Sequence, residues 1–371
     1  MGRIYGAFSV VESRCGTKTY LERMKIALKE KKTRNPKRKW VVFLAVLMAV
    51  AALAVAGYFI ARAVAQSLIQ SEIQTRSDWN IDTGDVADRE AAQQVTVYTA
   101  PVEASIDVIQ IVPDEYEEEG FTYYDEDVQD RLAYTLLDLT RKESYTLESP
   151  LAVLNPFGTG SNGLYMYFRT DAPTRVTYTV HVEDESIPDY TATVNNQGAD
   201  ADGYSRLQEF LLIGLVPGME NTVTLSAETR QQGTAYTFTI DMPESASGYA
   251  SQLEVEDGGA DVGQLSDGLF YAMGFGDYYG YTFFFDNEGV LRYEMVLEGY
   301  HSDRFLWDDD GSLITCVGSR KVARINRFGQ VAQVYGLGQY ELHHDINWGP
   351  EGTILALATD TEGETVEDQV L

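Results

Sequence analysis

Two stretches of similar pattern decide the fold: "FFFDNEGVLRYEMVLEGY" at 283–300 and "ARINRFGQVAQVYGLGQY" at 323–340. Their offset is 40 residues, and the alignment pairs Gly289 with Gly329. Each stretch has an apolar run, a turn that contains glycine and a second apolar run, which is typical of two antiparallel strands joined by a tight turn. The alternative is that two unrelated hairpins happen to align.

The similarity continues, at an offset of 41, from "FLWDDDGSLIT" (305–315) to "INWGPEGTILA" (346–356), and it pairs Trp307 with Trp348. Four strands in about 40 residues is the period of a β-propeller blade. A propeller closes only with about four or more blades, and residues 262–371 hold two to three. We therefore expect an incomplete β-propeller, and a chain that is the N-terminal part of a longer protein.

Upstream, residues 95–245 alternate with period two and are rich in β-branched and aromatic residues. "GLYMYFRT" and "RVTYTVHVED" are expected to be separate short strands, with "APT" (172–174) as the turn between them. Strands at about ten-residue spacing predict a β-sandwich of immunoglobulin or fibronectin-III style. The acidic run at 113–130 is expected to be a solvated loop, because it lacks the glycine spacing of a calcium-binding loop.

The N-terminal part of the chain differs sharply in charge from the rest. Residues 1–40 hold 12 Lys and Arg against 3 Asp and Glu, whereas the remainder holds 16 basic against 54 acidic residues. Between them, 41–62 begins with a run of 20 uncharged residues, and a helix rising about 1.5 Å per residue would cross the bilayer core over that length. The alternative is a buried helix of a soluble protein.

These features predict a single-pass protein of the cell membrane, held in the lipid bilayer by 41–62. The basic tail is cytoplasmic by the positive-inside rule, 63–94 is a stalk, and the acidic bulk is extracellular. Such an acidic bulk excludes nucleic acid as a partner. The two cysteines, Cys15 and Cys316, lie on opposite sides of this span. Cys316 is therefore either a buried free thiol or bonded to a cysteine outside this sequence.

Two of the four histidines stand side by side in "YELHHDINWGPEGTILALA" (340–358), as His343 and His344, followed by Asp345. Neighbouring strand residues point to opposite faces, so both imidazoles reach one ligand only if the strand bends. The spacing disfavours a metal site, and we expect neither a metal nor a cofactor. From the pattern alone, one histidine packs in the core and the other hydrogen-bonds to Asp345 or a backbone carbonyl.

"LNPFGTGSNGLYMYFRTDAPTRVTYTV" (154–180) followed by "YELHHDINWGPEGTILAL" (340–357) resembles the bacterial arylsulfate sulfotransferases. The resemblance covers roughly 150–371. It implies a sandwich followed by a six-bladed propeller with an "HHD" in an early blade. It also implies sulfuryl transfer from a phenolic sulfate to a phenol, without the nucleotide donor PAPS. The mechanism implied is ping-pong, through a sulfohistidine.

The resemblance implies roles for three residues. His344, and after it His343, become catalytic residues that bind the sulfuryl oxygens or donate a proton to the leaving oxygen, and Asp345 becomes a substrate-binding residue. The later motifs of the family, including the Gln-His-Asp that holds the nucleophile, do not occur in this sequence. We therefore expect the full-length parent to be the enzyme and this chain alone to be inactive.

The alternatives are a non-catalytic cell-surface binding or adhesion protein and, less favoured, a membrane-tethered hydrolase or lyase that uses the acidic clusters. The propeller segment also holds a group of basic residues. They could form a locally positive pocket or be ordinary solvated surface: Arg304, Arg320, Lys321, Arg324 and Arg327. The oligomeric state stays open.

Overall fold

The computed structural model describes residues 48, 51, 55–60, 94–254, 268–274, 276–300, 304–363 and 368–370. The chain divides into two compact units, Met1–Ile69 and Gln70–Leu371. Most of the predicted span at 41–62, the tail at 1–40 and nearly all of the stalk at 63–94 lie outside the described residues. Among the residues that are described, no helix is both long and apolar enough to cross a bilayer.

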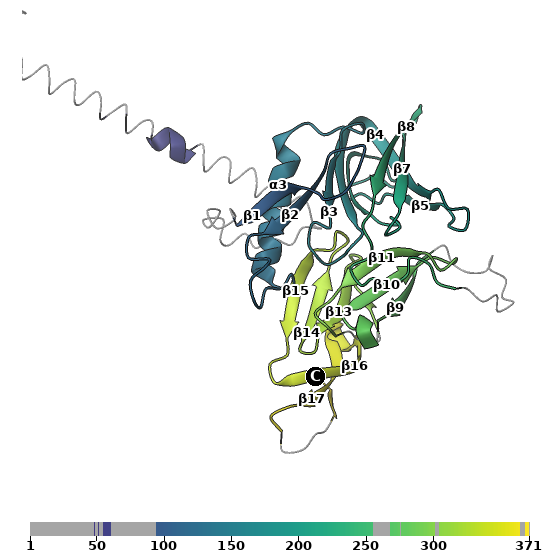
Figure 1. The fold of residues 1–371 in the computed structure, drawn as a ribbon. Coiled ribbons are helices and arrows are strands. Elements are labelled where there is room, and N and C mark those ends of the chain that lie inside the picture. The colour runs from purple at the N-terminus through teal and green to yellow at the C-terminus, as the bar shows by residue number, and fades with distance from the viewer. Residues whose placement is uncertain are drawn as a thin grey trace, which may run out of the picture. The chain divides into compact units, whose positions relative to one another are not determined.

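The second unit begins with eight strands that form one continuous sheet folded into a sandwich (Figure 1). The strands are β1 (Val95–Thr99), β2 (Val108–Pro113), β3 (Leu151–Leu154), β4 (Leu164–Val182), β5 (Tyr190–Thr193), β6 (Ser205–Leu212), β7 (Glu220–Glu228) and β8 (Gly233–Asp241). Their order is β1-β2-β3-β4-β7-β8, with β5 and β6 also paired to β4. The chain is mainly β, as predicted.

Strand β4 belongs to both layers of the sandwich. Its first part pairs with β3 and β6, and its second part pairs with β5 and β7. The register shifts between Arg169 and Thr174, where the strand bends. The buried side chains of the two parts, such as Phe168 and Val176, then share one core.

The prediction of a turn at "APT" is therefore wrong, because the chain stays in one strand of 19 residues. An unpaired bulge tolerates Pro173, which has no backbone N–H to donate to a ladder.

A helix, α3 (Glu126–Lys142), interrupts the strands and was not predicted. Its N-cap is Asp125, whose Oδ1 accepts the backbone N–H of Asp127 at 2.9 Å. Leu132 and Leu136 are fully buried on its apolar face, at the i, i+4 spacing of a helix. The acidic composition of 113–130 was interpreted as loop throughout, whereas its last residues form the first turn of α3, where carboxylates interact favourably with the helix dipole.

Three small antiparallel sheets follow, of three, four and three strands. They contain β9 (Phe270–Met273), β10 (Tyr281–Phe285), β11 (Leu291–Val296), then β12 (Leu306–Trp307), β13 (Leu313–Gly318), β14 (Lys321–Ile325), β15 (Val331–Gly336), then β16 (Tyr340–Trp348), β17 (Ile354–Asp360), β18 (Asp368–Val370). Two short 3-10 helices, η5 (Gly276–Tyr278) and η6 (Pro350–Gly352), lie in their loops. Cys316 is buried on β13 and forms no disulfide with another described residue.

The two turns that define the sequence repeat have the same hydrogen bonds. Gly289 and Gly329 have φ values of 76° and 84°, in the left-handed region that favours glycine. Each glycine N–H donates to the carbonyl three residues earlier, on Asp286 (3.1 Å) and on Asn326 (2.9 Å). The β10–β11 and β14–β15 hairpins are thus the same local structure, placed 40 residues apart.

The sandwich covers the outer edge of β11. Ser161 N–H donates to Glu294 O (3.1 Å) and Val296 N–H donates to Thr159 O (3.0 Å), while Gly160 forms an isolated antiparallel bridge with Met295. An uncovered strand edge offers unpaired backbone groups to other chains. The 159–161 segment therefore completes the hydrogen bonding of the first small sheet.

Helix α3 covers the corresponding edge of β15 and also contacts β1 and β2 of the sandwich (Figure 1). Gln129, which is fully buried, accepts the Val331 N–H at 2.9 Å and donates to the carbonyls of Tyr123 and Phe157. Glu126 accepts the Val334 N–H at 2.7 Å. Side chains of α3 thus replace a missing neighbouring strand.

Arg292 is the largest fully buried side chain at this junction, with 1% of its surface exposed. Its Nε donates to Asp286 Oδ2 (2.6 Å), another guanidinium nitrogen donates to Pro188 O (2.7 Å), and the guanidinium lies 5.4 Å from the Tyr190 ring centre. A buried guanidinium is tolerated only when its donors are satisfied. Arg292 therefore ties the 187–190 loop of the sandwich to the β10–β11 turn.

Replacing Arg292 with methionine is expected to lower the free energy of unfolding by about 3–5 kcal/mol, because Asp286 would lose its buried partner. Urea denaturation measures the change. Arg175→Met is the control, since Arg175 pairs with Glu228 at 3.0 Å on an exposed part of the sandwich, where a lost pair costs about 1 kcal/mol or less. Equal losses for the two variants would contradict this account.

Candidate active site

The predicted His-His-Asp sequence lies in a bulge of β16. Leu342 and Ile346 both pair with β17, but three residues, 343–345, separate them where β17 has only one. A regular strand would alternate these side chains between its two faces. The extra residues break that alternation, as bulges beside active sites commonly do.

His344 has a backbone φ of 67°, which is uncommon for a residue with a side chain. Its N–H donates to the hydroxyl of Tyr300 at 3.1 Å. The rings of His343 and His344 are in edge-to-face contact, with centroids 5.2 Å apart and planes at 86°. The strand therefore has the bend that is needed to bring two neighbouring imidazoles to one place.

Asp345 is held by an arginine from the preceding sheet segment. Arg304 Nε donates to Asp345 Oδ1 at 3.1 Å, and a terminal nitrogen lies 3.1 Å from Oδ2. Asp345 Oδ1 also accepts the Ile346 N–H at 2.9 Å. This two-point geometry fixes the orientation of the Arg304 guanidinium against Asp345, the residue that follows the paired histidines. With the repeat offset of 41, Asp303 aligns in sequence with His344. Position 303 lies outside the described residues.

The other basic residues of this segment do not gather at the histidines. Lys321 pairs with Glu298 (2.8 Å), and Arg324 pairs with Asp308 (2.8 Å) and Asp310 (2.7 Å). Arg320 lies 4.0 Å from Glu341. Each of these three charges lies close to a carboxylate. The five basic residues of the propeller segment therefore do not form one locally positive pocket.

An apolar cavity of about 350 Å³ lies among β6, β9–β14 and the 159–161 segment. We call it the aromatic cavity. It is lined by Thr159, Leu211, Ile213, Leu269, Tyr271, Phe284, Tyr293, Met295, Trp307, Gly311, Leu313, Ile325, Asn326, Arg327 and Gly329. Sequence reasoning missed it, although the aromatic residues of "FFFDNEGVLRY" and the paired Trp307 were visible signals.

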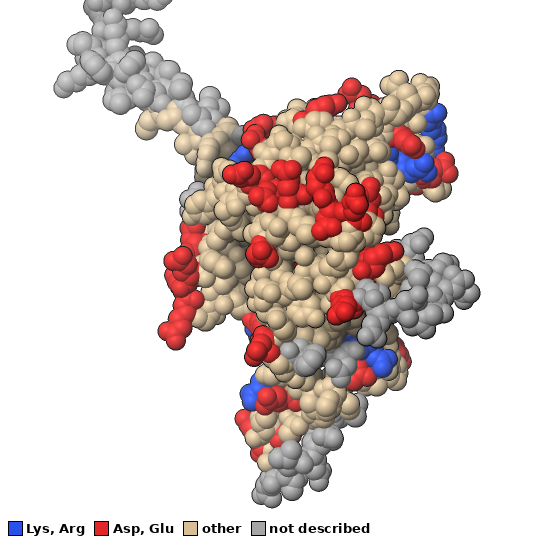
Figure 2. All heavy atoms as spheres, turned by 45° about the vertical axis from the view of Figure 1, so that its right-hand side comes forward, with Lys and Arg blue, Asp and Glu red and all other residues tan. Residues whose placement is uncertain are grey.

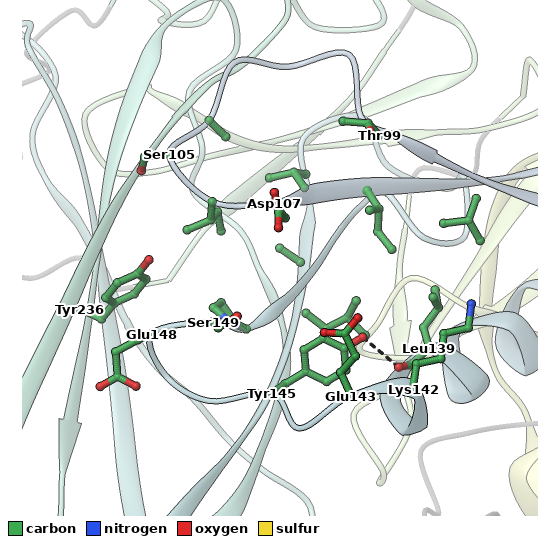
Figure 3. A pocket seen from close by; sticks show the side chains of 18 residues that line it. Thr99, Ser105, Asp107, Leu139, Lys142, Glu143, Tyr145, Glu148, Ser149 and Tyr236 are labelled. Atoms are coloured by element: carbon green, nitrogen blue, oxygen red, sulfur yellow. Dashed lines mark hydrogen bonds between the residues drawn. The ribbon is translucent and has the colours of Figure 1, made fainter.

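A larger cavity of about 650 Å³ lies on the sandwich, between β2, the end of α3 and β8 (Figure 3). Three carboxylates line it, those of Asp107, Glu143 and Glu148, against one basic residue, Lys142. The Tyr145 hydroxyl closes one side by donating to the Leu139 carbonyl at 3.0 Å, as the dashed line in Figure 3 marks. This lining suits a cationic ligand better than an anionic one. None of the predicted site residues lines it.

Two family models match the chain in sequence order. One, described as the arylsulfotransferase Ig-like domain, matches residues 151–243, which hold β3–β8. The other, described as arylsulfotransferase (ASST), matches residues 254–371, which hold the three small sheets and His343–Asp345. The chain belongs to the arylsulfotransferase family. No curated protein matches it.

Membership of the arylsulfotransferase family makes phenols and aryl sulfates the substrate class to consider. Among the described residues, no group of three His, Cys, Asp or Glu side chains is placed to hold a metal ion. The exposed imidazole of His344 and the guanidinium of Arg304 can supply hydrogen-bond donors to the oxygens of a sulfuryl group, whereas both ring nitrogens of His343 are buried. The roles of His343, His344 and Asp345 stay predictions.

The backbone at His344 provides a test of the bulge. His344→Gly is expected to raise the free energy of unfolding by about 1 kcal/mol, because glycine adopts a positive φ without strain. Glu341→Gly, at an exposed position of the same strand, is expected to lower it by about 0.5–1 kcal/mol. Urea denaturation of both variants gives the comparison, and a loss of stability in His344→Gly would show that the bulge is not strained.

Proposed function

We propose that this chain is the membrane-anchored N-terminal part of an aryl-sulfate sulfotransferase. The enzyme would move a sulfuryl group from a phenolic sulfate ester to a phenol acceptor, without PAPS. The observation that carries the proposal is the match of both arylsulfotransferase family models, in order, over residues 151–243 and 254–371. The bulge on β16 supports it, because it places two imidazoles and the Arg304–Asp345 pair at one locus.

In the proposed ping-pong cycle, a histidine nitrogen bonds to the sulfur of the donor while the sulfur–aryl oxygen bond breaks. The phenolate leaves with the bonding electrons and takes a proton. The acceptor phenol then loses its proton and attacks the sulfur, and the nitrogen–sulfur bond breaks. The resemblance assigns the nucleophile to a Gln-His-Asp motif that residues 1–371 do not contain, so the chain alone should not turn over.

Within this cycle, His344 or His343 donates the proton to the leaving phenolate, since an imidazole can hold and release a proton near neutral pH. Arg304 binds the sulfuryl oxygens, whose negative charge must be stabilised as the bond to the phenolate breaks. Asp345 fixes the plane of the Arg304 guanidinium through two contacts. Asp345 would thus serve substrate binding through Arg304.

We propose further that the three small sheets are consecutive blades of a six-bladed propeller. The matching turns at Gly289 and Gly329 support this arrangement. So does the chain order, which returns after β15 to a new sheet that starts at β16. In such a wheel the first strand of each blade lines the central channel, where β16 would present His343 and His344.

The assay uses the protein encoded by the complete reading frame, with 4-nitrophenyl sulfate as donor and phenol as acceptor. Arg304→Gln is expected to lower kcat/KM by about 10²–10³-fold, the usual loss when one donor to developing charge is removed. Arg320→Gln is the matched control, since Arg320 is equally exposed, with 49% of its side chain accessible against 47% for Arg304, and contacts neither histidine nor Asp345.

Several results would count against this function. Nitrophenol release that does not depend on phenol, with no sulfated histidine trapped, would exclude ping-pong transfer. A protein that binds aryl sulfates without any turnover would favour the alternative, a non-catalytic cell-surface binding or adhesion protein. Equal losses in Arg304→Gln and Arg320→Gln would remove Arg304 from the site.

The proposed anchor is 41–62, with the N-terminus in the cytoplasm and the bulk of the chain outside the cell. The uncharged run and the change from basic to acidic composition support it, because basic residues flank the cytoplasmic side of membrane spans. The intact protein should stay in the membrane fraction after extraction with alkaline carbonate, and deleting 41–62 should release it. Deleting 63–84, a segment of equal length in the proposed stalk, should leave it bound. Release by both deletions, or by neither, would contradict the proposed anchor.

A further inference from the structure

The aromatic cavity is a second place where an aryl group can bind, and it shares no residue with the histidine bulge. Its volume of about 350 Å³ falls within the range of small-molecule sites, about 300–1,000 Å³. Its walls come from both the sandwich and the first two small sheets. The cavity is therefore part of the junction that Arg292 and the 159–161 segment hold together.

Aromatic rings form much of the wall. Phe284 and Tyr271 line the cavity and both pack on Phe305, which is not among the lining residues: the Phe284 and Phe305 centroids are 5.8 Å apart with planes at 11°, and the Tyr271 centroid lies 4.6 Å from that of Phe305. Tyr271 and Trp307 are 42% and 59% exposed, and both line the cavity. Large aromatic side chains left open to solvent beside a cavity provide faces on which another ring can stack.

The charge of the lining is unusual for this protein. Figure 2 shows more Asp and Glu than Lys and Arg side chains on the visible face, in keeping with a net charge of −29. No carboxylate is among the described residues that line the aromatic cavity, and Arg327 is the single charged residue among them. An anionic group would meet one cation there and no wall of like charge.

Arg327 is fixed in place by the sandwich. Its guanidinium donates to the carbonyl of Asn195 at 2.5 Å and lies 4.4 Å from the centre of the Phe328 ring. The positive charge of Arg327 is thus held at the wall of the cavity.

Tyr293 supplies a polar group in the wall. Its pKa is raised by burial, so the phenol stays a neutral donor. A side chain at Gly160 would place its Cβ 2.4 Å from the Tyr293 hydroxyl oxygen, so the glycine makes room for that hydroxyl. No described residue hydrogen-bonds to it, which leaves it available to an oxygen of a ligand.

We propose that the aromatic cavity binds a monocyclic aryl anion. The ring stacks against Trp307 and Tyr271, an oxygen of the anionic group accepts from Arg327, and Tyr293 donates a second hydrogen bond. The proposal does not rest on sulfuryl transfer, since the binding needs only the residues of the cavity.

The test is ligand-observed NMR titration of the full chain with benzenesulfonate, which has no sulfate ester to transfer. Trp307→Ala is expected to weaken binding about 5- to 150-fold, because an aromatic stacking face is worth about 1–3 kcal/mol. Trp348→Ala is the matched control: Trp348 occupies the equivalent position of the next repeat and does not line the cavity. It should leave the affinity within about twofold.

Two further comparisons identify the parts of the ligand. Arg327→Gln should weaken benzenesulfonate about tenfold, the loss of one charge-assisted hydrogen bond, and should leave anisole unchanged. Cyclohexanesulfonate should bind about two- to tenfold more weakly than benzenesulfonate, since it cannot stack. Leu211→Trp places a larger side chain into the cavity from β6 and should abolish binding. This variant replaces Trp307→Ala in the test if Trp307→Ala does not fold.

The proposal is overturned if benzenesulfonate does not bind, or if Trp307→Ala and Trp348→Ala weaken it equally. It is also overturned if binding survives Leu211→Trp but is lost when both His343 and His344 are replaced by alanine, since the ligand would then sit at the bulge. Failure of sulfuryl transfer with binding intact would refute the proposed function alone.

Discussion

Strand edges impose the constraint on which this structure depends. β11 and β15 end their small sheets, and each would expose a row of unpaired backbone groups. The sandwich supplies what is missing, through the 159–161 segment on β11 and the side chains of Gln129 and Glu126 on β15. Arg292 adds buried hydrogen bonds to the 187–190 loop. The sandwich and the first two small sheets therefore stabilise each other, and the aromatic cavity exists only because they meet.

The candidate site arises where the repeat is broken. The β10–β11 and β14–β15 hairpins share their turn geometry, whereas β16 contains extra residues that its partner β17 does not match. His344 takes a positive φ there, at a cost that a regular strand would avoid. The local deviation brings the imidazoles together and lets Asp345 hold Arg304. Strained backbone at a functional position is a common way to place side chains that a regular element would separate.

The net charge of this protein does not predict the charge of its individual cavities. The surface is strongly acidic, yet most of the basic residues of the small sheets are held in individual ion pairs. The charged residues that line the larger cavity are three carboxylates and one lysine, whereas no carboxylate lines the aromatic cavity among the described residues. Salt screens the general repulsion of an anion beyond about 10 Å, so the groups within a cavity decide which ligand it accepts. The arylsulfotransferase family implies aryl sulfates, which are anions, as substrates. Of the two cavities, the aromatic cavity has the lining that suits such an anion.

The sequence by itself determined most of the strands, the 40-residue repeat and the family, because turns of the form Asp/Asn-x-x-Gly and period-two strands are encoded by neighbouring residues. It also signalled that both imidazoles needed a bent strand. Helix α3, the single long strand β4, the bulge at His344 and the aromatic cavity were decided only by the tertiary structure. Each of them depends on partners far apart in the chain, such as Gln129 and Val331, which are 202 residues apart. No local pattern specifies which distant backbone group a side chain will meet, since that follows from the packing of the sandwich on the small sheets.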